Sequence, residues 1–376
     1  MKKRRMFILV IVMAFVYLSC NTSDPDNKPA DHPVMFMGDA MHHAETNSMA
    51  ITETPAVKWK FKSNGPVINS CVIDNNRLLF GRNDSNLYCL NTETGAQYWK
   101  YKTNGAICST PAVAGNTVYF ISYDGIFYAL NKNDGSLTWS FKTDGERRFA
   151  AKGIHGAKPK DSLMKDDWDF FLSSPAIEGG LVCFGTGSGY VYALNTETGK
   201  EVWKFKTNEV THCSPAIAYG NIYIGSWDTY LYALDLKTGR ERWKFKTGED
   251  TVIHNQTGIQ NPPVIYDSVL YFGCRDSHIY ALDAITGRKL FERFEDYSWV
   301  NSPVVRENKV LYTLGDGSSL IALNRNNYDS VFQTSVKGWV MSPPAISGSI
   351  AYFGDINGFL NAIDINTGKE VWIYQT

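Results

Sequence analysis

Hydrophobic and polar residues alternate in short runs that recur along most of the chain. In the stretch 191–205, VYALNTETGKEVWKF, four alternating residues precede a polar turn that ends at Gly199, and a run with large apolar residues follows. Alternation with a period of two is typical of a half-buried β-strand. Glycine lets the chain reverse because it adopts positive φ without a Cβ clash. The stretch is therefore predicted to be a β-hairpin that needs neighbouring copies to bury its apolar face.

The second strand of this hairpin recurs at a nearly constant spacing. Eight copies are separated by seven intervals, and five of these intervals are 40 or 41 residues long. Within 206–245 the strand-like runs are HCSPAIA, NIYIG, LYALD and RWKF. Four short antiparallel strands in about 40 residues form the unit of a β-propeller blade. The aromatic residues that mark the eight outer strands are Trp59, Trp99, Trp139, Trp203, Trp243, Phe291, Phe332 and Trp372.

The predicted fold is an all-β propeller built from four-stranded antiparallel blades. An open solenoid would expose a strand edge at each end, and ring closure removes those edges. Seven full sets of inner strands favour seven blades. The additional outer strand around Trp59 leaves an alternative, because it either competes with the Trp372 strand to close the ring or belongs to an incomplete eighth blade.

Two intervals of the repeat are longer than the others. They carry insertions at 143–171 and 247–260 inside a single predicted propeller domain, 55–376. Strand direction alternates within a blade, so connectors between blades lie on the same face as the loops between second and third strands. Both insertions are connectors of this kind. They are therefore predicted to converge on one face, which we call the insertion-bearing face, and long loops on a rigid scaffold often carry binding function.

The N-terminus has the features of an export signal. Residues 1–20 contain a basic start, an apolar run from Met6 to Tyr17 and the sequence Leu18-Ser19-Cys20, which resembles a bacterial lipobox. We therefore predict a signal peptide over 1–20 and lipid attachment at Cys20. Residues 21–54 are rich in polar residues and proline and are predicted to form a flexible tether, although its apolar stretch at 35–37 could dock on the folded body.

Composition narrows the classes of partner. The chain has 376 residues, 44% hydrophobic residues and a formal net charge of −1, so it can bury a large core and offers no basic footprint for nucleic acid. Beyond Cys20, six cysteines remain and none forms a CxxC motif. Small buried core residues are the expected role for them. We expect a monomeric propeller whose only membrane contact is the N-terminal lipid.

The repeat pattern SPA[VI], [VI]Y[FI]G and [LVI]YAL[DN]xxTGxxxWxF resembles the pyrroloquinoline-quinone (PQQ)-type propeller repeat over residues 55–376. That repeat is shared by quinoprotein dehydrogenases and BamB-like outer-membrane assembly lipoproteins. The resemblance implies that each outer-strand Trp docks against a small residue of the third strand and against the next blade. Phe291 and Phe332 depart from this pattern, so their docking contacts are open.

The insertion-bearing face is expected to carry most of the side chains that could bind a partner or ligand. His212 is expected at the mouth of the central channel, where its role is either structural or binding. Polar side chains from the insertions and neighbouring loops are expected to form a surface for a partner or ligand. The candidate residues of this face are Arg147, Arg148, Lys152, His155, His212, Trp227, His254, Asn255, Gln256 and Arg275.

Two further sets of polar residues follow the repeat. Aspartates at one repeat position are best explained as turn-forming residues; they are Asp124, Asp228, Asp276, Asp316 and Asp355. Small polar residues near the start of each first strand either line a wet channel or, the interpretation we favour, cap strand ends through bonds from side chain to backbone. These are Asn69, Ser109, Ser173, Cys213, Asn261, Asn301 and Ser342.

The sequence favours a binding protein over an enzyme. Quinoprotein dehydrogenases use a calcium ion, an Asp base and a Trp beneath the quinone, and none of these is matched residue by residue. GxSxG, HExxH and CxxCH motifs are absent. We expect a non-catalytic envelope lipoprotein, without a cofactor, that serves as a scaffold or binding module. It is expected in the outer membrane facing the periplasm, with exposure at the cell surface as the alternative. The BamB-like resemblance suggests a protein partner in outer-membrane protein assembly.

Two alternatives remain open from the sequence. In one, the chain is a periplasmic quinoprotein, with PQQ implied by the resemblance alone, or a small-ligand-binding protein whose pocket lies under the two insertions. In the other, it binds an envelope polysaccharide through Trp168 and Trp227, because aromatic faces provide large apolar contact area.

Overall fold

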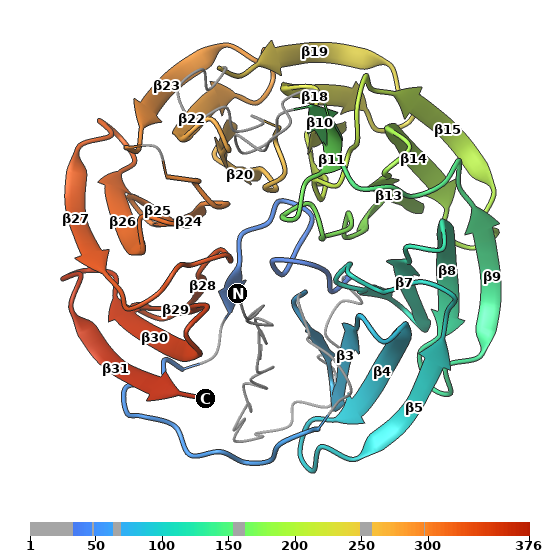
Figure 1. The fold of residues 1–376 in the computed structure, drawn as a ribbon, viewed down its shortest axis with the longest axis horizontal. Helices are drawn as coiled ribbons and strands as arrows, with labels where there is room; N and C mark the ends of the chain where they lie inside the picture. Colours follow the sequence, from blue (N-terminus) through green and yellow to red (C-terminus); the bar gives the residue numbers. More distant parts are fainter. Residues whose placement is uncertain (1–32, 47–48, 63–68, 153–161, 249–257, 297) are drawn as a thin grey trace, which may run out of the picture.

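A computed structural model describes residues 33–46, 49–62, 69–152, 162–248, 258–296 and 298–376. Seven four-stranded antiparallel sheets surround a central axis (Figure 1). The prediction of an all-β propeller with seven blades is confirmed. Within the described ranges no helix has the length and apolar character that a membrane crossing requires. The predicted signal peptide and Cys20 lie outside these ranges.

The first four blades follow one another along the chain, each with its strands in sequence order. Blade 1 comprises β2 (Val72–Asp74), β3 (Arg77–Gly81), β4 (Asn86–Asn91) and β5 (Gln97–Lys102). Blade 2 comprises β6 (Ala112–Ala114), β7 (Thr117–Ile121), β8 (Ile126–Asn131) and β9 (Leu137–Lys142). Blade 3 comprises β12 (Ala176–Glu178), β13 (Leu181–Gly185), β14 (Tyr190–Asn195) and β15 (Glu201–Lys206). Blade 4 comprises β16 (Ala216–Ala218), β17 (Asn221–Gly225), β18 (Tyr230–Asp235) and β19 (Glu241–Lys246).

The remaining three blades complete the ring. Blade 5 comprises β20 (Val264–Tyr266), β21 (Val269–Gly273), β22 (His278–Asp283) and β23 (Lys289–Phe294). Blade 6 comprises β24 (Val304–Arg306), β25 (Lys309–Leu314), β26 (Ser319–Asn324) and β27 (Ser330–Ser335). Blade 7 comprises β28 (Ala345–Ser347), β29 (Ile350–Gly354), β30 (Phe359–Asp364) and β31 (Glu370–Gln375). A short strand, β1 (Glu45–Thr46), joins blade 7, and β10 (Ala150–Lys152) pairs with β11 (Leu163–Lys165) in the first insertion.

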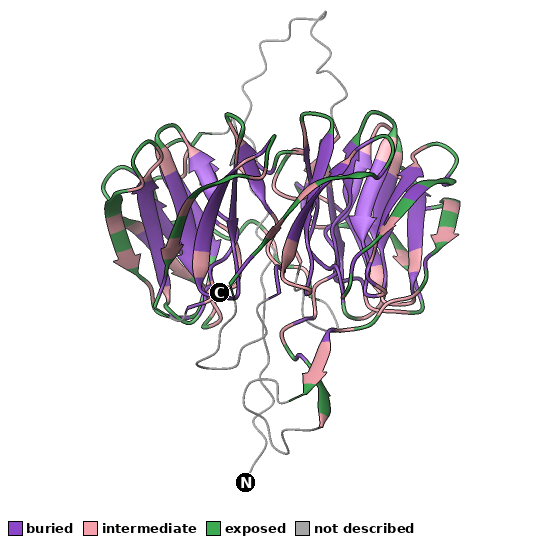
Figure 2. Cartoon of the chain, turned by 90° about the horizontal axis from the view of Figure 1, so that it is seen from above, coloured by how far each residue is buried: buried purple, intermediate pink, exposed green. Residues whose placement is uncertain are grey.

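Each blade buries its middle strands and exposes one side of its outer strand. In β14 the four central residues are buried, whereas β15 alternates and buries Trp203. Figure 2 shows buried strands within the ring and more exposed strands at its outer edge. The hairpin predicted over 191–205 is therefore confirmed. Its turn is closed by Asn195, whose Oδ1 accepts the amide of Thr198 at 2.9 Å, and by Gly199 at φ 68°.

The outer-strand tryptophans fasten each blade to the next, as the family resemblance implied. Trp203 lies opposite Ala193 in the sheet register, and its indole N–H donates to Leu236 O of blade 4 at 2.9 Å. The ring covers Gly239, where an added Cβ would lie 2.6 Å from the indole. Glycine is required at this turn because no larger residue leaves room for the Trp.

Blade 5 departs from this pattern in two coupled positions. Phe291 replaces the Trp, and Tyr328 of blade 6 stands where other blades have glycine, at φ 61°. The two rings stack at a centroid distance of 4.1 Å and an interplanar angle of 11°. Because the phenyl ring of Phe291 is smaller than an indole, it leaves room for the Tyr328 ring. Phe332 of blade 6 keeps the glycine contact, because an added Cβ on Gly368 would lie 2.6 Å from its ring.

Residues 49–62 occupy the outer position between blades 7 and 1 (Figure 1). Trp59 Nε1–H donates to Thr92 O of blade 1 at 2.9 Å, as the other tryptophans do toward their following blades. Trp372 of blade 7 donates in turn to Ile51 O at 2.8 Å. The additional outer segment therefore bridges the last blade to the first, and the complete four-stranded blades number seven.

Residues 33–46, which we call the channel strap, cross the centre of the ring (Figure 1). Val34 and Val113 of β6 exchange two backbone hydrogen bonds of 2.8 and 2.7 Å. The strap ends in β1, which pairs in parallel with β28. Amides of β16, β20 and β28 donate to strap carbonyls; the pairs are Ile217 with Ala40, Ile265 with Met41 and Ile346 with Ala44.

The channel strap differs from the flexible tether predicted over 21–54. Met35 is 4% exposed and Met37 packs on the cores of blades 5 to 7, so the apolar stretch docks as the alternative expected. The physical reason is that the innermost strands present unpaired amides to the channel, which the extended strap satisfies. Pro33 lines the face of the hairpin turns, opposite the insertions.

The recurring polar residues have structural roles. Asp124 accepts the amide of Ile126 through Oδ1 and the Tyr128 hydroxyl through Oδ2, so the turn-forming interpretation is confirmed there and at the equivalent Asp228 and Asp276. The small polar residues mostly bond to the backbone of the neighbouring blade: Ser173 Oγ–H donates to Cys213 O at 2.8 Å. Of the six cysteines beyond Cys20, five are buried and Cys71 is half-buried.

Candidate functional site

The first insertion leaves blade 2 and crosses over blade 3 to contact blades 4 and 5. Its strands β10 and β11 form a small hairpin that projects from the rest of the ring (Figure 2). At the base of this hairpin the amide of Asp166 donates to Phe149 O at 2.9 Å. Of the second insertion, residues 247–248 and 258–260 are described. For the second insertion, the structure therefore tests the prediction that both insertions lie on one face only through these flanking residues.

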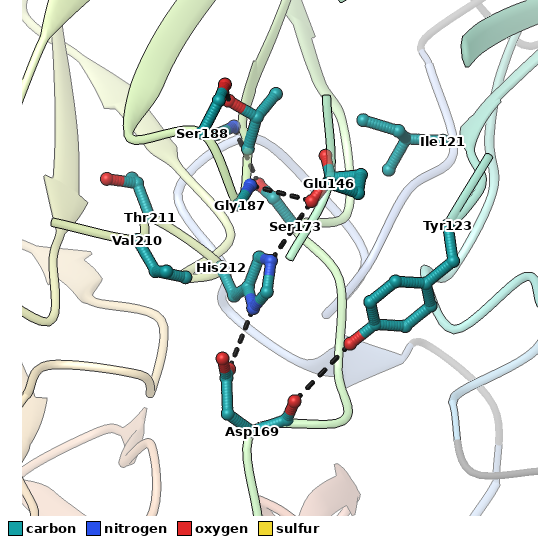
Figure 3. Close-up of polar contacts among 12 residues, drawn as sticks. Ile121, Tyr123, Glu146, Asp169, Ser173, Gly187, Ser188, Val210, Thr211 and His212 are labelled. Atoms are coloured by element: carbon teal, nitrogen blue, oxygen red, sulfur yellow. Dashed lines mark hydrogen bonds and ion pairs between the residues drawn. The ribbon is translucent and has the colours of Figure 1, made fainter. Parts of the chain in front are cut away.

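His212 lies between two carboxylates from the first insertion (Figure 3). Its Nδ1 is 2.7 Å from Asp169 Oδ1 and its Nε2 is 3.1 Å from Glu146 Oε2. The side chains of all three residues are fully buried. Glu146 Oε2 also accepts the amide of Gly187 at 2.6 Å, and Asp169 Oδ2 accepts the amide of Phe149 at 2.5 Å. The cluster fastens both ends of the first insertion to blades 3 and 4.

The pKa values of this cluster follow from its burial and its charges. Burial alone lowers the pKa of His212, but the charges of Asp169 and Glu146 and the hydrogen bonds to them outweigh it and raise the pKa to about 10. Burial raises the pKa of Glu146, while the hydrogen bond and charge of His212 oppose that rise. At neutral pH His212 is therefore an imidazolium that donates from both nitrogens. A proton shuttle needs a pKa near the operating pH, so this histidine is suited to fastening the loop.

A second buried cation lies beside this cluster. Arg275 is 1% exposed, and its guanidinium lies between Trp227 and Trp299 at 4.5 and 4.0 Å from the ring centroids. Its Nη2 is 3.0 Å from Asp166 Oδ2. On the far side of Trp227, the Phe149 ring stacks at 4.4 Å and 8°. The stack joins blades 4, 5 and 6 to the base of the hairpin through cation–π contacts.

The candidate residues divide into three groups in the structure. Arg147 and Lys152 are exposed and Arg148 is half-buried. His212, Trp227 and Arg275 are between 1% and 4% exposed, so in this conformation they support the surface from below. The candidates that lie outside the described residues are His155, His254, Asn255 and Gln256.

The structure adds residues that the sequence did not single out. Glu146, Asp166, Asp169 and Trp299 complete the two buried clusters, and each comes from a connector far from its partner in sequence. Their only sequence signal was membership in a connector. Trp339, 42% exposed, lies on the same face, and its ring is 6.2 Å from that of Trp168.

The polysaccharide alternative depended on exposed faces of Trp168 and Trp227. Trp227 is 4% exposed, and both of its faces are covered, by Phe149 on one side and by Arg275 on the other. It is therefore not available to stack on a sugar. Trp168 is half-buried and contacts Trp299 edge to face at 5.6 Å.

The described residues do not fit a quinone with its calcium ion. Calcium requires six to eight oxygen ligands, and within the described ranges no group of three or more His, Cys, Asp or Glu side chains could hold a metal. Glu146 and Asp169 are paired with His212, and the side chains of all three residues are fully buried. A pocket of about 420 Å³ lies on the opposite face, between blades 2 and 3 near Pro33.

The sequence matches a family model described as outer membrane protein assembly factor BamB, over residues 49–158, 160–296 and 275–376. The crystal structure of BamB from Moraxella catarrhalis is similar, with 18% identity, a TM-score of 0.63 and coverage of 85% of this chain and 88% of that one. Quinohemoprotein alcohol dehydrogenase from Comamonas testosteroni has 13% identity, a TM-score of 0.73 and coverage of 91% and 73%. A europium-containing methanol dehydrogenase has 14% identity, a TM-score of 0.71 and coverage of 93% of this chain and 86% of that one. No curated protein matches the sequence significantly.

Proposed function

The chain belongs to the family of outer membrane protein assembly factor BamB, and on this premise we propose that it is a non-catalytic, lipid-anchored propeller of the cell envelope. In this proposal it binds a protein partner in outer-membrane protein assembly through its insertion-bearing face. The dehydrogenase neighbours share the fold at 13–14% identity, and fold alone does not transfer an activity.

The observation that carries the proposal is the rigid attachment of the first insertion. His212 holds Asp169 and Glu146, while Arg275 holds Asp166, so two buried cations fasten a loop that would otherwise be free to move. Fixing a surface before binding reduces the entropy that association must overcome. A buried support beneath an exposed loop is therefore what a docking surface requires.

The surface above these supports has a mixed chemical character. Lys152 provides positive charge, Arg147 forms an ion pair with Glu209, and Leu163, Met164 and Trp339 are 70%, 40% and 42% exposed. Aromatic residues and arginine are enriched in the cores of protein interfaces. This combination favours a protein partner over a small ligand, which would need a concave pocket.

Site-specific photocrosslinking in the native envelope tests this proposal. Photoreactive residues at positions 152, 164 and 339 sample the insertion-bearing face, and matched residues at Tyr219 and Ile285, each 52% exposed in the opposite turns, serve as controls. We expect one outer-membrane assembly protein to be captured from the first set alone. Capture from the opposite turns alone, or no capture from either set, would contradict the proposal.

The proposed anchor has its own test. Replacing Cys20 with Ala should move the protein from the membrane fraction to the soluble envelope fraction, because a lipid chain contributes about 0.8 kcal/mol per buried CH₂ group. Retention of the variant in membranes would contradict lipid attachment at this residue and would leave the partner-binding face unaffected.

A further inference from the structure

The β10–β11 hairpin is a two-stranded sheet, and among the described residues no third strand pairs with either of its edges. All three residues of β11 are exposed, with Leu163 at 70% and Met164 at 40%. Ala151 of β10, in contrast, packs on the cluster of Phe149, Val210 and Trp227. The outer edge of β11 is therefore the more accessible of the two.

The register shows which backbone groups of β11 point outward. The amide of Asp166 donates to Phe149 O, and the paired residues then follow as Ala150 with Lys165, Ala151 with Met164 and Lys152 with Leu163. Hydrogen-bonded and non-hydrogen-bonded pairs alternate in an antiparallel ladder. Met164 therefore bonds inward to β10, whereas the N–H and C=O groups of Leu163 and Lys165 face the free edge.

The side chains beside this edge have a defined charge. Lys152 and Leu163 are paired and share one face of the hairpin with Lys165, two positions along β11. Both lysines are exposed. Lysines on an edge strand repel a second copy of the same strand. They attract an incoming strand that carries carboxylates at alternate positions, because cross-strand opposite charges stabilise pairing.

We propose that β11 is a docking edge to which a protein partner adds a β-strand, with acidic side chains on the hairpin face that carries Lys152 and Lys165 and apolar side chains on the opposite face, beside Met164. The inference rests on the proposed function and specifies the kind of segment that the partner presents. Strand addition of this kind derives affinity from main-chain hydrogen bonds and specificity from the alternating side chains. The fastened base of the hairpin holds the edge in place before the partner arrives.

The test uses the full chain and a short synthetic peptide of alternating glutamate and valine, with a lysine–valine peptide of the same length as its counterpart. We expect the acidic peptide to bind and to slow hydrogen exchange of the Leu163 and Lys165 amides by about tenfold or more, leaving Met164 unchanged. Equal binding of the two peptides, or no protection at positions 163 and 165, would overturn the proposal.

Two variants at one position separate backbone pairing from side-chain contact. Leu163→Pro removes an outward N–H and should weaken binding by at least about tenfold, since proline is tolerated at an edge but cannot donate. Leu163→Ala keeps the amide and should retain most of the affinity. Should the proline variant unfold, as judged by its melting temperature, the pair Lys152→Glu and Lys165→Glu replaces it and should reverse the preference between the peptides. Unchanged binding in either set would overturn the proposal.

The same variants distinguish this inference from the proposed function. If a photoreactive residue at Trp339 captures the same partner from wild type and from Leu163→Pro, the face binds but β11 does not pair, and this inference fails alone. If Trp339 captures nothing in either background, the proposed function fails. Dimers in ultracentrifugation that Leu163→Pro abolishes would assign the edge to a second copy and would also overturn the inference.

Discussion

His212 Nδ1 lies 2.7 Å from Asp169 Oδ1, and neither side chain is exposed to solvent. The histidine precedes β16 of blade 4, whereas the aspartate belongs to the connector between blades 2 and 3. With Glu146 on the other ring nitrogen, this pair fastens the two ends of the first insertion to the ring. Buried charged side chains therefore hold the insertion-bearing face in place.

Raising the pH should loosen the first insertion through His212. The pKa of this residue is raised from 6.5 to about 10, so its contribution to stability is complete below pH 6.5 and is lost as the pH rises toward 10. The free energy of unfolding should fall by up to about 1.4 kcal/mol per pH unit in this window. Urea unfolding between pH 6.5 and 9 measures the slope. His212→Gln should abolish it, whereas His278→Gln, at a partly exposed site, should keep most of it; equal slopes in all three proteins would contradict the assignment.

Lowering the pH should release the channel strap through His42. Burial lowers the pKa of this residue to about 4, although its hydrogen bond to Pro263 O opposes the shift. The sign is opposite to that of His212: the stabilising contribution is present above pH 6.5 and is lost as the pH falls toward 4. Hydrogen exchange at the amides of Ile217 and Ile265, which bond to the strap, should lose protection across this range after correction for the intrinsic rate. The loss should be smaller in His42→Gln, and equal loss in the variant would contradict a role for this histidine.

Removing Arg275 should destabilise the fold more than removing an exposed arginine. Arg275→Ala leaves the buried Asp166 without this cation and removes two cation–π contacts, with an expected cost of about 3–5 kcal/mol. Arg275→Lys keeps the charge but not the planar stack and should cost about 1–2 kcal/mol. Arg242→Ala, at an exposed ion pair with Asp235, is the matched control and should cost less than about 0.5 kcal/mol. Denaturant unfolding ranks the three variants, and similar costs for Arg275→Ala and Arg242→Ala would contradict the support role.

Phe291 and Tyr328 should behave as one coupled unit. Phe291→Trp alone forces an indole against the Tyr328 ring and should cost about 1–3 kcal/mol. Tyr328→Gly alone loses an aromatic stack and leaves a cavity. The double variant recreates the Trp-on-glycine contact of blades 3 and 4, so a double-mutant cycle should show a favourable coupling of about 0.5–3 kcal/mol. Additive single effects would show that the two positions are independent.

Much of the architecture could be predicted because it depends on short-range order. The alternation in 191–205 predicts a half-buried strand and a turn that reverses it. The strand and the turn are present in β14 and β15, although the closed ring buries β14 on both faces. The repeat of about 40 residues determines the blades, because most repeats present a Trp to the turn glycine of the next blade. Seven complete sets of inner strands predict the number of blades. The role of the additional outer segment follows from the hydrogen bond that Trp59 donates to Thr92 O of blade 1.

The sequence predicts that the candidate residues lie on one face, but it does not separate the exposed residues from the buried residues that support them. Arg147 and Arg275 are equally plausible binding residues in sequence, yet one is exposed and the other is enclosed by two indoles. His212 and its two carboxylates are 43 and 66 residues apart, a separation that no local period encodes.

The sequence by itself determined the propeller, its repeat and the face that carries the insertions. The tertiary structure alone decided that residues 33–46 cross the centre of the ring, that His212 and Arg275 support the surface from below and that β11 has no strand partner on its outer side among the described residues. The reason is physical: strand period and turn chemistry act between near neighbours, whereas burial, ion pairing and unpaired backbone edges depend on which distant segments the closed ring brings together.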